Sequence, residues 1–263
     1  MVERKSTIRL RLLLAYQGTD FHGWQLQDGV RTVQGCLEEA LVRLAGREVR
    51  VHGAGRTDAG VHATGQVAHV DVPASRKGLP WLRALNALTP PDLCIVRVEP
   101  VSETFHARFD AIRKTYSYTL WHESDWLLPQ RREHVWQVGK LDLDDMTVAA
   151  RWLIGRRDWS AFQNQGSAVR CAVRTVRDIH SRPGLHPQER VWLFTADGFL
   201  KQMVRNLMGC LVMVGKGRLG LDQVQEILAL GMRESAPATA PARGLCLERV
   251  DYPEGADECR DSA

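Results

Sequence analysis

Strand and helix patterns follow the same order in both halves of the chain, and this repetition limits the fold more than any other feature. From Ile8 to Leu14, apolar residues alternate with their neighbours, a period of two that predicts a strand. Thr32 is the predicted N-cap of the helix that follows, and Gly46 ends it. The predicted strands and helices of the first half, in the order β-α-β-β-α-β, cover residues 8–15, 32–44, 49–54, 66–72, 79–88 and 93–98.

The second half repeats this order and adds a short helix before its last strand. Its predicted elements cover residues 115–121, 142–154, 173–179, 191–196, 199–214, 222–230 and 245–252. The order β-α-β-β-α-β is the ferredoxin-like, or RRM-like, plan. We therefore predict an α+β protein whose halves, residues 1–107 and 108–253, join their sheets edge to edge around a central active-site cleft. Residues 254–263 are predicted to form a polar tail.

Composition excludes several classes of protein. Hydrophobic residues make up 44% of the chain and charged residues 25%, as in soluble globular proteins. No apolar run is long enough to cross a bilayer, and the first residues lack the pattern of a signal peptide, so we expect a cytoplasmic protein. The 6 cysteines form no C-x-x-C pair and the 9 histidines form no H-x-x-x-H group, so no metal site is implied. A net charge of +4 permits a polyanionic partner but does not require one.

The connection between the second and third predicted strands is the most informative segment, with the sequence Gly53-Ala-Gly-Arg-Thr-Asp-Ala-Gly-Val-His-Ala63. Its glycines allow unusual backbone dihedral angles and a close approach to a ligand. Arg56, Asp58 and His62 are its candidate functional side chains. From these residues alone, the segment is either a functional loop or a surface loop with a turn aspartate. It lacks the glycine and lysine spacing of a phosphate-binding loop.

The string Gly55-Arg-Thr-Asp-Ala-Gly-Val-His-Ala63, followed by Gly65-Gln-Val67, resembles the active-site motif of the TruA family of tRNA pseudouridine synthases. The resemblance extends over nearly the whole chain. Further matching segments are Tyr16-Gln-Gly-Thr19, Gly23-Trp-Gln25, Arg31-Thr-Val-Gln-Gly35, Phe105-His-Ala-Arg-Phe109, Lys114-Thr-Tyr-Ser-Tyr118, Asp158-Trp-Ser-Ala-Phe162, Met203-Val-Arg-Asn206 and Ala240-Pro-Ala-Arg-Gly-Leu245. Because so many segments match in one order, chance similarity is a poor explanation.

The resemblance implies that Asp58 is the catalytic nucleophile. A carboxylate can form a covalent intermediate with uridine at C1′ of the ribose or at C6 of the uracil, and the sequence leaves both open. The resemblance also implies that Arg205, on the apolar helix at 199–214, is the cationic partner of Asp58. It implies a substrate contact for Tyr116, whose ring we expect to stack on the target uracil.

Three further residues each have two possible roles. Leu245 is either an apolar wall of the uracil pocket or a core residue. Arg56 either binds a phosphate beside the flipped nucleotide or fills the space that the base leaves. His62 either faces the ligand or is hydrogen-bonded to backbone. The chain departs from the family at Gln202, where many relatives carry histidine.

The resemblance further implies a cofactor-free isomerase that forms a homodimer and acts on uridines 38, 39 and 40 in the anticodon arm of tRNA. Two alternatives remain from the residues themselves. One is a non-catalytic RNA-binding protein with two RRM-like halves, although the chain lacks the RNA-binding string of that module. The other is a hydrolase that uses Asp58 and Asp71 as an acid/base pair.

Overall fold

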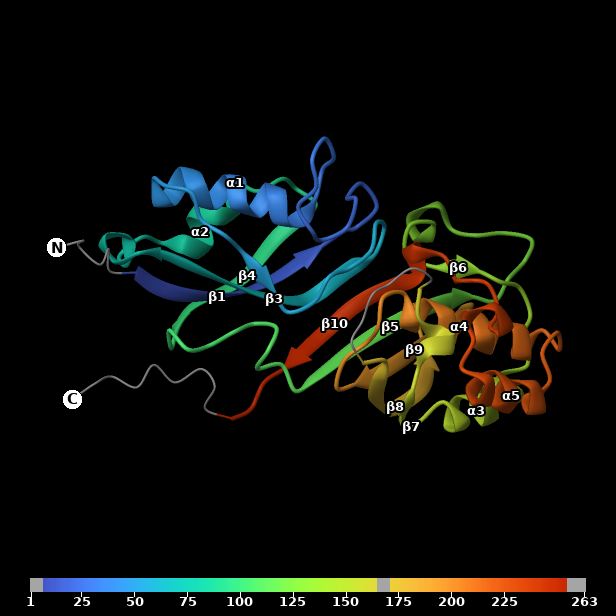
Figure 1. Cartoon of the computed structure of the whole chain (residues 1–263). Helices are drawn as coiled ribbons and strands as arrows, with labels where there is room; N and C mark the ends of the chain where they lie inside the picture. The colour runs from blue at the N-terminus through green and yellow to red at the C-terminus, as the bar shows by residue number, and fades with distance from the viewer. Residues whose placement is uncertain (1–6, 165–170, 255–263) are drawn as a thin grey trace. The chain divides into compact units, whose positions relative to one another are not determined.

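The computed structural model of the chain describes residues 7–164 and 171–254 (Figure 1). The chain divides into two compact units, the first comprising Met1–Ile112 with Leu247–Ala263 and the second Arg113–Cys246. Each unit contains helices and sheet strands, so the predicted α+β class is confirmed. The predicted polar tail lies outside the described residues, apart from Glu254.

The sheet of the first unit is built around β1 (Thr7–Tyr16). β1 pairs antiparallel with β3 (His62–Pro73) along one edge and with β4 (Leu93–Val101) along the other. The short strand β2 (His52–Gly53) pairs with β3, and β10 (Leu245–Asp251) is also a neighbour of β3. The strand order in this unit is therefore β4-β1-β3-β10, with β2 beside β3.

The alternation in β1 places its leucines in the core. Leu12 and Leu14 are fully buried, and they lie on one face of the sheet because successive side chains of a strand point to opposite faces. The helices α1 (Val33–Ala45) and α2 (Trp81–Asn86) lie on the same side of this sheet (Figure 1). The core therefore lies between the sheet and these helices.

Local sequence signals fix both ends of α1, as predicted. Thr32 is in an extended conformation and its side chain accepts a hydrogen bond from the backbone N–H of Gly35 at 3.2 Å. At the other end Gly46 has a φ of 71°, a left-handed conformation, and its N–H donates to the carbonyl of Val42 at 2.9 Å. Helix α2 covers Trp81–Asn86 and is shorter than the predicted 79–88, with Pro80 as its N-cap.

The sheet of the second unit has the strand order β5-β9-β8-β7, and β6 pairs in parallel with β5. The bounds of its strands and α-helices are β5 (Arg113–Trp121), β6 (Trp136–Gln137), α3 (Leu143–Trp152), β7 (Gly155–Asp158), β8 (Val173–Pro183), β9 (Glu189–Ala196), α4 (Met203–Gly215) and α5 (Leu221–Leu230). Single 3-10 turns occur in both units at Ala74–Arg76, Pro129–Arg131, Ser160–Phe162, Arg233–Ser235 and Ala242–Gly244.

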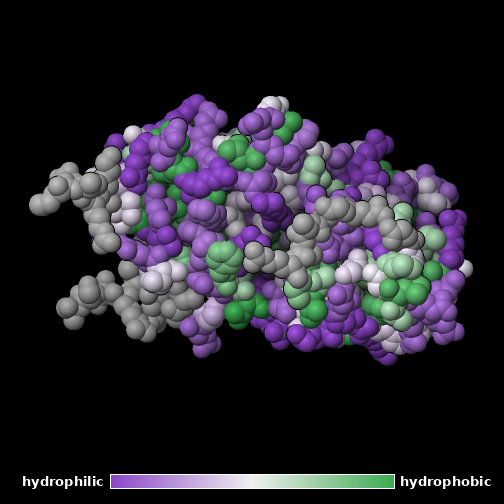
Figure 2. Space-filling model, in the orientation of Figure 1, coloured by the Kyte–Doolittle hydropathy of each residue, from purple (hydrophilic) through white to green (hydrophobic). Residues whose placement is uncertain are grey.

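Helix α4 is the most buried helix of this unit. It begins at Met203 rather than at the predicted residue 199, because Gln202 has a φ of 61° and a left-handed residue cannot continue an α-helix. The side chains of Leu207 and Leu211 are fully buried. On the face of the molecule shown in Figure 2, hydrophilic residues surround smaller separate hydrophobic areas, as expected when most apolar side chains pack inside.

Candidate active site

Asp58 lies on the connection between β2 and β3 in the first unit, where the chain turns sharply. The N–H of Val61 donates to the carbonyl of Asp58 at 3.2 Å, and Gly60, within this turn, has a φ of +78°. Asp58 is half-buried, between the buried Thr57 and the exposed Ala59. The turn therefore leaves the Asp58 side chain partly accessible to solvent.

Thr57 anchors this loop to the body of the first unit. Its hydroxyl is hydrogen-bonded to the Tyr16 hydroxyl at 2.8 Å, and its carbonyl accepts from the N–H of Trp24 at 3.0 Å. The Gln66 amide donates to the carbonyl of Gly55 at 2.9 Å. Because the bonded side chains are buried, these contacts hold the backbone on the N-terminal side of Asp58 in place.

Two glycines of the first loop allow a second close contact with the Asp58 loop. Gly23 has a φ of +86°, and a Cβ added there would lie 2.6 Å from the carbonyl oxygen of Thr57. A Cβ at Gly18 would lie 2.0 Å from the carbonyl oxygen of Val61. Both distances are shorter than real Cβ contacts allow, so the two loops pack backbone against backbone. This contact explains why glycines stand in the segments 16–19 and 23–25.

His62 is buried and hydrogen-bonded to the backbone of the first loop. Its ring is 6% exposed, and Nδ1 accepts from the N–H of Gly18 at 3.0 Å. Arg56, two residues before Asp58, has an exposed side chain.

Asp71 is not available to act with Asp58, so the hydrolase alternative is wrong. Both oxygens of Asp71 accept from the guanidinium of Arg9 at 2.7 Å, which lowers the pKa of this carboxyl below its usual value. Arg9 and Asp71 are paired near the start of β1, whereas the Asp58 loop is bonded to Tyr16 at its end. Arg9 and Tyr16 are seven positions apart on the strand, a distance of about 20 Å, which is too far for an acid/base pair.

A cluster of three histidines lies in the first unit near Asp71, two of them on strands β2 and β3 and one on the connection after β4. The rings of His52 and His69 are stacked with centroids 5.0 Å apart, and His106 lies 4.6 Å from His69. Burial, followed by the charges of Arg9, His106 and His52, lowers the pKa of His69 from 6.5 to about 4. His69 Nδ1 accepts from the N–H of Ala107 at 3.1 Å, so the cluster ties the connection after β4 to the sheet.

Tyr116 lies in the second unit, on β5 opposite Phe194 of β9. Its ring is 7% exposed and meets Phe199 edge to face, with centroids 5.3 Å apart. Tyr118, two residues on, is fully buried and its hydroxyl donates to the carbonyl of Pro241 at 2.7 Å. Burial raises the pKa of Tyr118 far above its usual value, so it is a core residue. Leu245 is also buried, at the start of β10.

Arg205 stands in the first turn of α4, where a loop holds it. Its Nε donates to the carbonyl of Ala240 at 2.8 Å, and the N–H of Ala240 donates back to the carbonyl of Arg205 at 3.2 Å. These two hydrogen bonds hold the start of α4 against the loop that contains Ala240.

Sequence reasoning missed Asn206, the residue that positions this loop. Asn206 is fully buried, its amide donates to the carbonyl of Phe162 at 2.8 Å, and its Oδ1 accepts from the Thr239 hydroxyl at 2.7 Å. A lone asparagine in a strongly apolar helix was the available signal, because a buried amide needs hydrogen-bond partners.

Within residues 7–164 and 171–254, no group of three or more His, Cys, Asp or Glu side chains is arranged to hold a metal ion. No helix in the same part of the chain has the length and apolar character needed to cross a membrane.

Comparison with known proteins identifies the family. The family model for tRNA pseudouridine synthase matches residues 13–110 and 149–253. A tRNA pseudouridine synthase A of Solidesulfovibrio magneticus is 55% identical over 249 residues, covering 93% of this chain and 91% of the relative. Those of Maridesulfovibrio salexigens and Chloroflexus aurantiacus are 49% and 44% identical, covering 94% of this chain in both comparisons and 91% and 89% of the relatives.

Among solved structures, a chain of a Cbf5-Nop10-Gar1 complex has a TM-score of 0.36 at 11% identity, covering 92% of this chain and 59% of that chain. This likeness is too low to support an inference. The sequence comparisons confirm the resemblance inferred from the motifs and set aside the non-catalytic alternative. The chain belongs to the TruA family of tRNA pseudouridine synthases and is an isomerase that forms pseudouridine in tRNA.

Proposed function

We propose that this enzyme converts uridine to pseudouridine at positions 38, 39 and 40 of the tRNA anticodon arm, through a covalent bond between the substrate and Asp58. The observation that supports this most directly is the placement of Asp58. A nucleophile must be accessible to its substrate and must be held in a fixed position while it reacts. The half-buried Asp58 follows directly on the anchored Thr57, and the loop therefore provides both conditions.

The reaction rearranges one nucleoside without gain or loss of atoms. The Asp58 carboxylate attacks C1′ of the ribose or C6 of the uracil, and the N1–C1′ bond breaks. The base turns over and C5 bonds to C1′. If Asp58 is bonded to C1′, that bond breaks as C5 bonds to C1′; if Asp58 is bonded to C6, its bond breaks after C5 has joined C1′. On both routes the carboxylate is regenerated, the C5 proton is lost to a base, and N1 takes up a proton.

Arg205 is proposed as the cationic partner of Asp58, because a guanidinium binds a carboxylate through charge-assisted hydrogen bonds. A matched test compares Arg205→Lys with Arg205→Ala. We expect partial turnover by the lysine variant and almost none by the alanine variant. Lysine keeps the positive charge but lacks the planar guanidinium with its paired N–H donors. Full turnover by Arg205→Ala would remove Arg205 from the mechanism.

The remaining site residues are assigned to substrate binding. Tyr116 stacks on the uracil ring, and Leu245 packs beside it as an apolar wall. Arg56, exposed two residues before the nucleophile, binds the phosphate of the flipped nucleotide. His62 supports the same loop through its bond to Gly18. We expect Tyr116→Ala to raise KM and to lower kcat, because the flipped uracil would lose the aromatic ring that replaces its stacking in the RNA.

The test of the reaction uses a tRNA transcript labelled with tritium at C5 of uridine and measures the tritium released to water. Wild-type protein is compared with Asp58→Asn, and with Asp28→Asn as a control for loss of one exposed carboxylate. Release by the wild type and the control, with none by Asp58→Asn at matched RNA binding, is the expected result. Release by Asp58→Asn would dismiss Asp58 as nucleophile and leave the reaction in place.

The target positions need separate transcripts. Each transcript keeps one uridine at position 38, 39 or 40 and carries cytidine at the other two. We expect modification of all three, because recognition of RNA shape and backbone tolerates a shift of one or two nucleotides. Modification of uridines elsewhere in the tRNA, and none at these three, would refute the positional assignment.

We further propose that each unit has the ferredoxin-like plan, that the enzyme is a homodimer and that it acts in the cytoplasm. The order β-α-β-β-α-β of β1 to β4 and the neighbours β4-β1-β3-β2 support the plan for the first unit. Sedimentation equilibrium tests the dimer, and a mass of 29.6 kDa, that of one chain, would exclude it. Fractionation of cells tests the location.

A further inference from the structure

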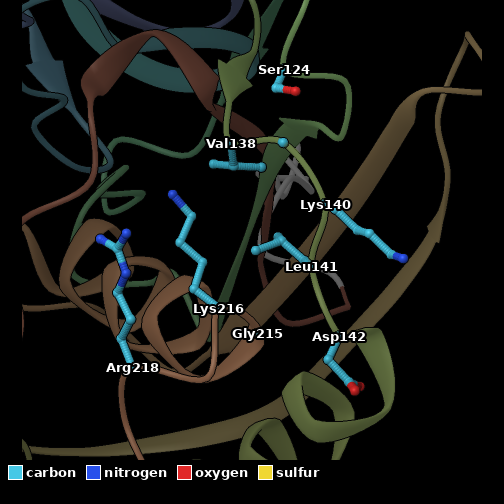
Figure 3. A pocket seen from close by; sticks show the side chains of 9 residues that line it. Ser124, Val138, Lys140, Leu141, Asp142, Gly215, Lys216 and Arg218 are labelled. Carbon is cyan, nitrogen blue, oxygen red and sulfur yellow. The ribbon is translucent and has the colours of Figure 1, made fainter.

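The second unit contains a cavity that the proposed chemistry does not use. Its volume is about 610 Å³, and it lies between the segment that leads from β6 into α3 and the C-terminal end of α4 (Figure 3). Arg205 stands at the opposite end of α4, ten positions before Gly215 in the same helix. At 1.5 Å per residue, the cavity is about 15 Å from Arg205 along the helix axis, so it is a separate feature of this unit.

Three cations line this cavity: Lys140, Lys216 and Arg218. All three are exposed, and in the described part of the chain none of them forms an ion pair. Figure 3 shows the side chains of Lys216 and Arg218 extending in the same direction, whereas Lys140 points to the opposite side. Lys216 and Arg218 are therefore placed to act on one ligand together.

The carboxylate in the lining does not neutralise these cations. Asp142 is the N-cap of α3, and its Oδ1 accepts from the backbone N–H groups of Asp144 and Asp145, at 3.0 Å each. A capping carboxylate is already stabilised by the N-terminus of its own helix. Lys216 follows α4, where a positive charge also stabilises the helix C-terminus, but that effect needs only one cation and no cavity.

Hydrogen bonds join the walls of the cavity to one another. The N–H of Asp142 donates to the carbonyl of Gly215 at 2.8 Å, and the N–H of Val138 donates to the carbonyl of Trp121 at 2.9 Å. A Cβ at Gly215 would lie 2.6 Å from Sδ of Met146, so α4 and α3 are in close contact there. The N–H of Arg218 donates to the carbonyl of Met213 at 2.9 Å, which fixes the turn after α4. The site therefore exists before any ligand binds.

We infer that this cavity binds a phosphodiester group of the substrate RNA, through Lys216 and Arg218. The inference rests on the proposed function, which supplies RNA as the polyanion. A guanidinium and an ammonium on one side of a concave site match the oxygens of a phosphate, and Ser124 adds a hydroxyl to the lining. Phosphate contacts fix the position of an RNA without reading its sequence, as an enzyme serving several neighbouring uridines requires.

The test compares the double variant Lys216→Gln/Arg218→Gln with the matched control Arg177→Gln/Arg182→Gln. The control removes the same charge from two exposed arginines of β8 in the same unit. The dissociation constant of unmodified tRNA is measured from low to moderate KCl concentration for both variants and for the wild type. Each lost phosphate contact is expected to reduce the slope of log Kd against log salt concentration by about 0.7 to 0.9.

We expect the cavity variant to bind tRNA roughly 10-fold more weakly at low salt, with the slope reduced by about 1, while kcat at saturating tRNA stays within about twofold of wild type. Equal slopes for the cavity variant and the control would overturn the inference. Titration with inorganic phosphate provides a second arm. Phosphate binding that the cavity variant loses, without a change in the tRNA slope, would indicate a site for free phosphate and would also overturn the inference.

Tritium release by the wild type separates this inference from the proposed function. If the wild type releases tritium but the cavity variant and the control have equal salt slopes, only the RNA contact at the cavity is refuted. Absence of both release and tRNA binding in the wild type would remove the proposed function and this inference with it. Because both substituted residues are exposed, the cavity variant is expected to keep a wild-type melting temperature, which confirms that it is folded.

Discussion

Replacing Gly23 by alanine tests whether backbone contact positions the Asp58 loop. Gly23 has a φ of +86°, and an added Cβ would lie 2.6 Å from the carbonyl oxygen of Thr57. The left-handed conformation costs an alanine about 1–2 kcal/mol. The shifts of side chains and backbone that accommodate the added Cβ cost about 1–3 kcal/mol more, as at other overpacked sites. We therefore expect Gly23→Ala to lower the free energy of unfolding by about 2–5 kcal/mol.

The chain offers a matched control at Gly29. This glycine has a φ of +75°, and a Cβ there would meet nothing within 4 Å. Gly29→Ala therefore carries the dihedral cost of about 1–2 kcal/mol without the steric one. The difference between the two variants in urea-induced unfolding isolates the contact with Thr57.

Activity gives the sharper readout. An ordinary Cβ contact needs 3.4 Å or more, so the carbonyl of Thr57 must retreat by close to 1 Å, and Asp58 is the next residue. A displacement of about 1 Å in a reacting group costs on the order of 100-fold in rate. We expect kcat for tritium release to fall about 100-fold in Gly23→Ala and less than about threefold in Gly29→Ala. Equal losses in both variants, or full activity in Gly23→Ala, would refute the reasoning.

Three further predictions concern single contacts. Tyr16→Phe removes the hydrogen bond to Thr57, and we expect urea unfolding to show a loss of about 0.5–1.5 kcal/mol together with a lower kcat. The pKa of His69 is lowered to about 4, so the unfolded chain binds more protons below pH 6.5, and stability must fall as the pH drops from 6.5 to 4. We expect this loss to be about 1–2 kcal/mol, below the full value of the shift because solvent reaches the cluster, and to be absent in His69→Asn. Arg131→Met leaves Glu189, 4% exposed, without the cation that bonds to it at 2.6 Å, and we expect a loss of about 3 kcal/mol that an accompanying Glu189→Gln largely restores.

Features that depend on neighbouring residues were predictable from the sequence. The alternation from Ile8 to Leu14 gave β1, and Thr32 with Gly46 gave both ends of α1, because capping and periodicity act within a few residues. The family was predictable for another reason. The motif around Asp58 and the segments that match in order are strings of adjacent residues, so they are visible without any knowledge of the fold.

Local prediction failed where distant residues decide the local structure. The strand predicted at 49–54 is reduced to His52–Gly53. The ring of Trp24 lies so near Gly53 that a Cβ there would be 2.5 Å from it. Alternation within residues 49–54 contains no information about this contact, because the ring comes from another loop.

Only the tertiary structure decided how the Asp58 loop is held and what its neighbours contact. The bond between Tyr16 and Thr57 joins residues 41 positions apart, and the bond between Gly18 and His62 joins residues 44 apart. The sequence gives no register between such distant segments, so the hydrogen bond between Gly18 and His62 could not be predicted from it. The sequence by itself determined the chemistry and the family, because those depend on which residues are present. The contacts that hold these residues in place depend on long-range packing, which only the folded chain specifies.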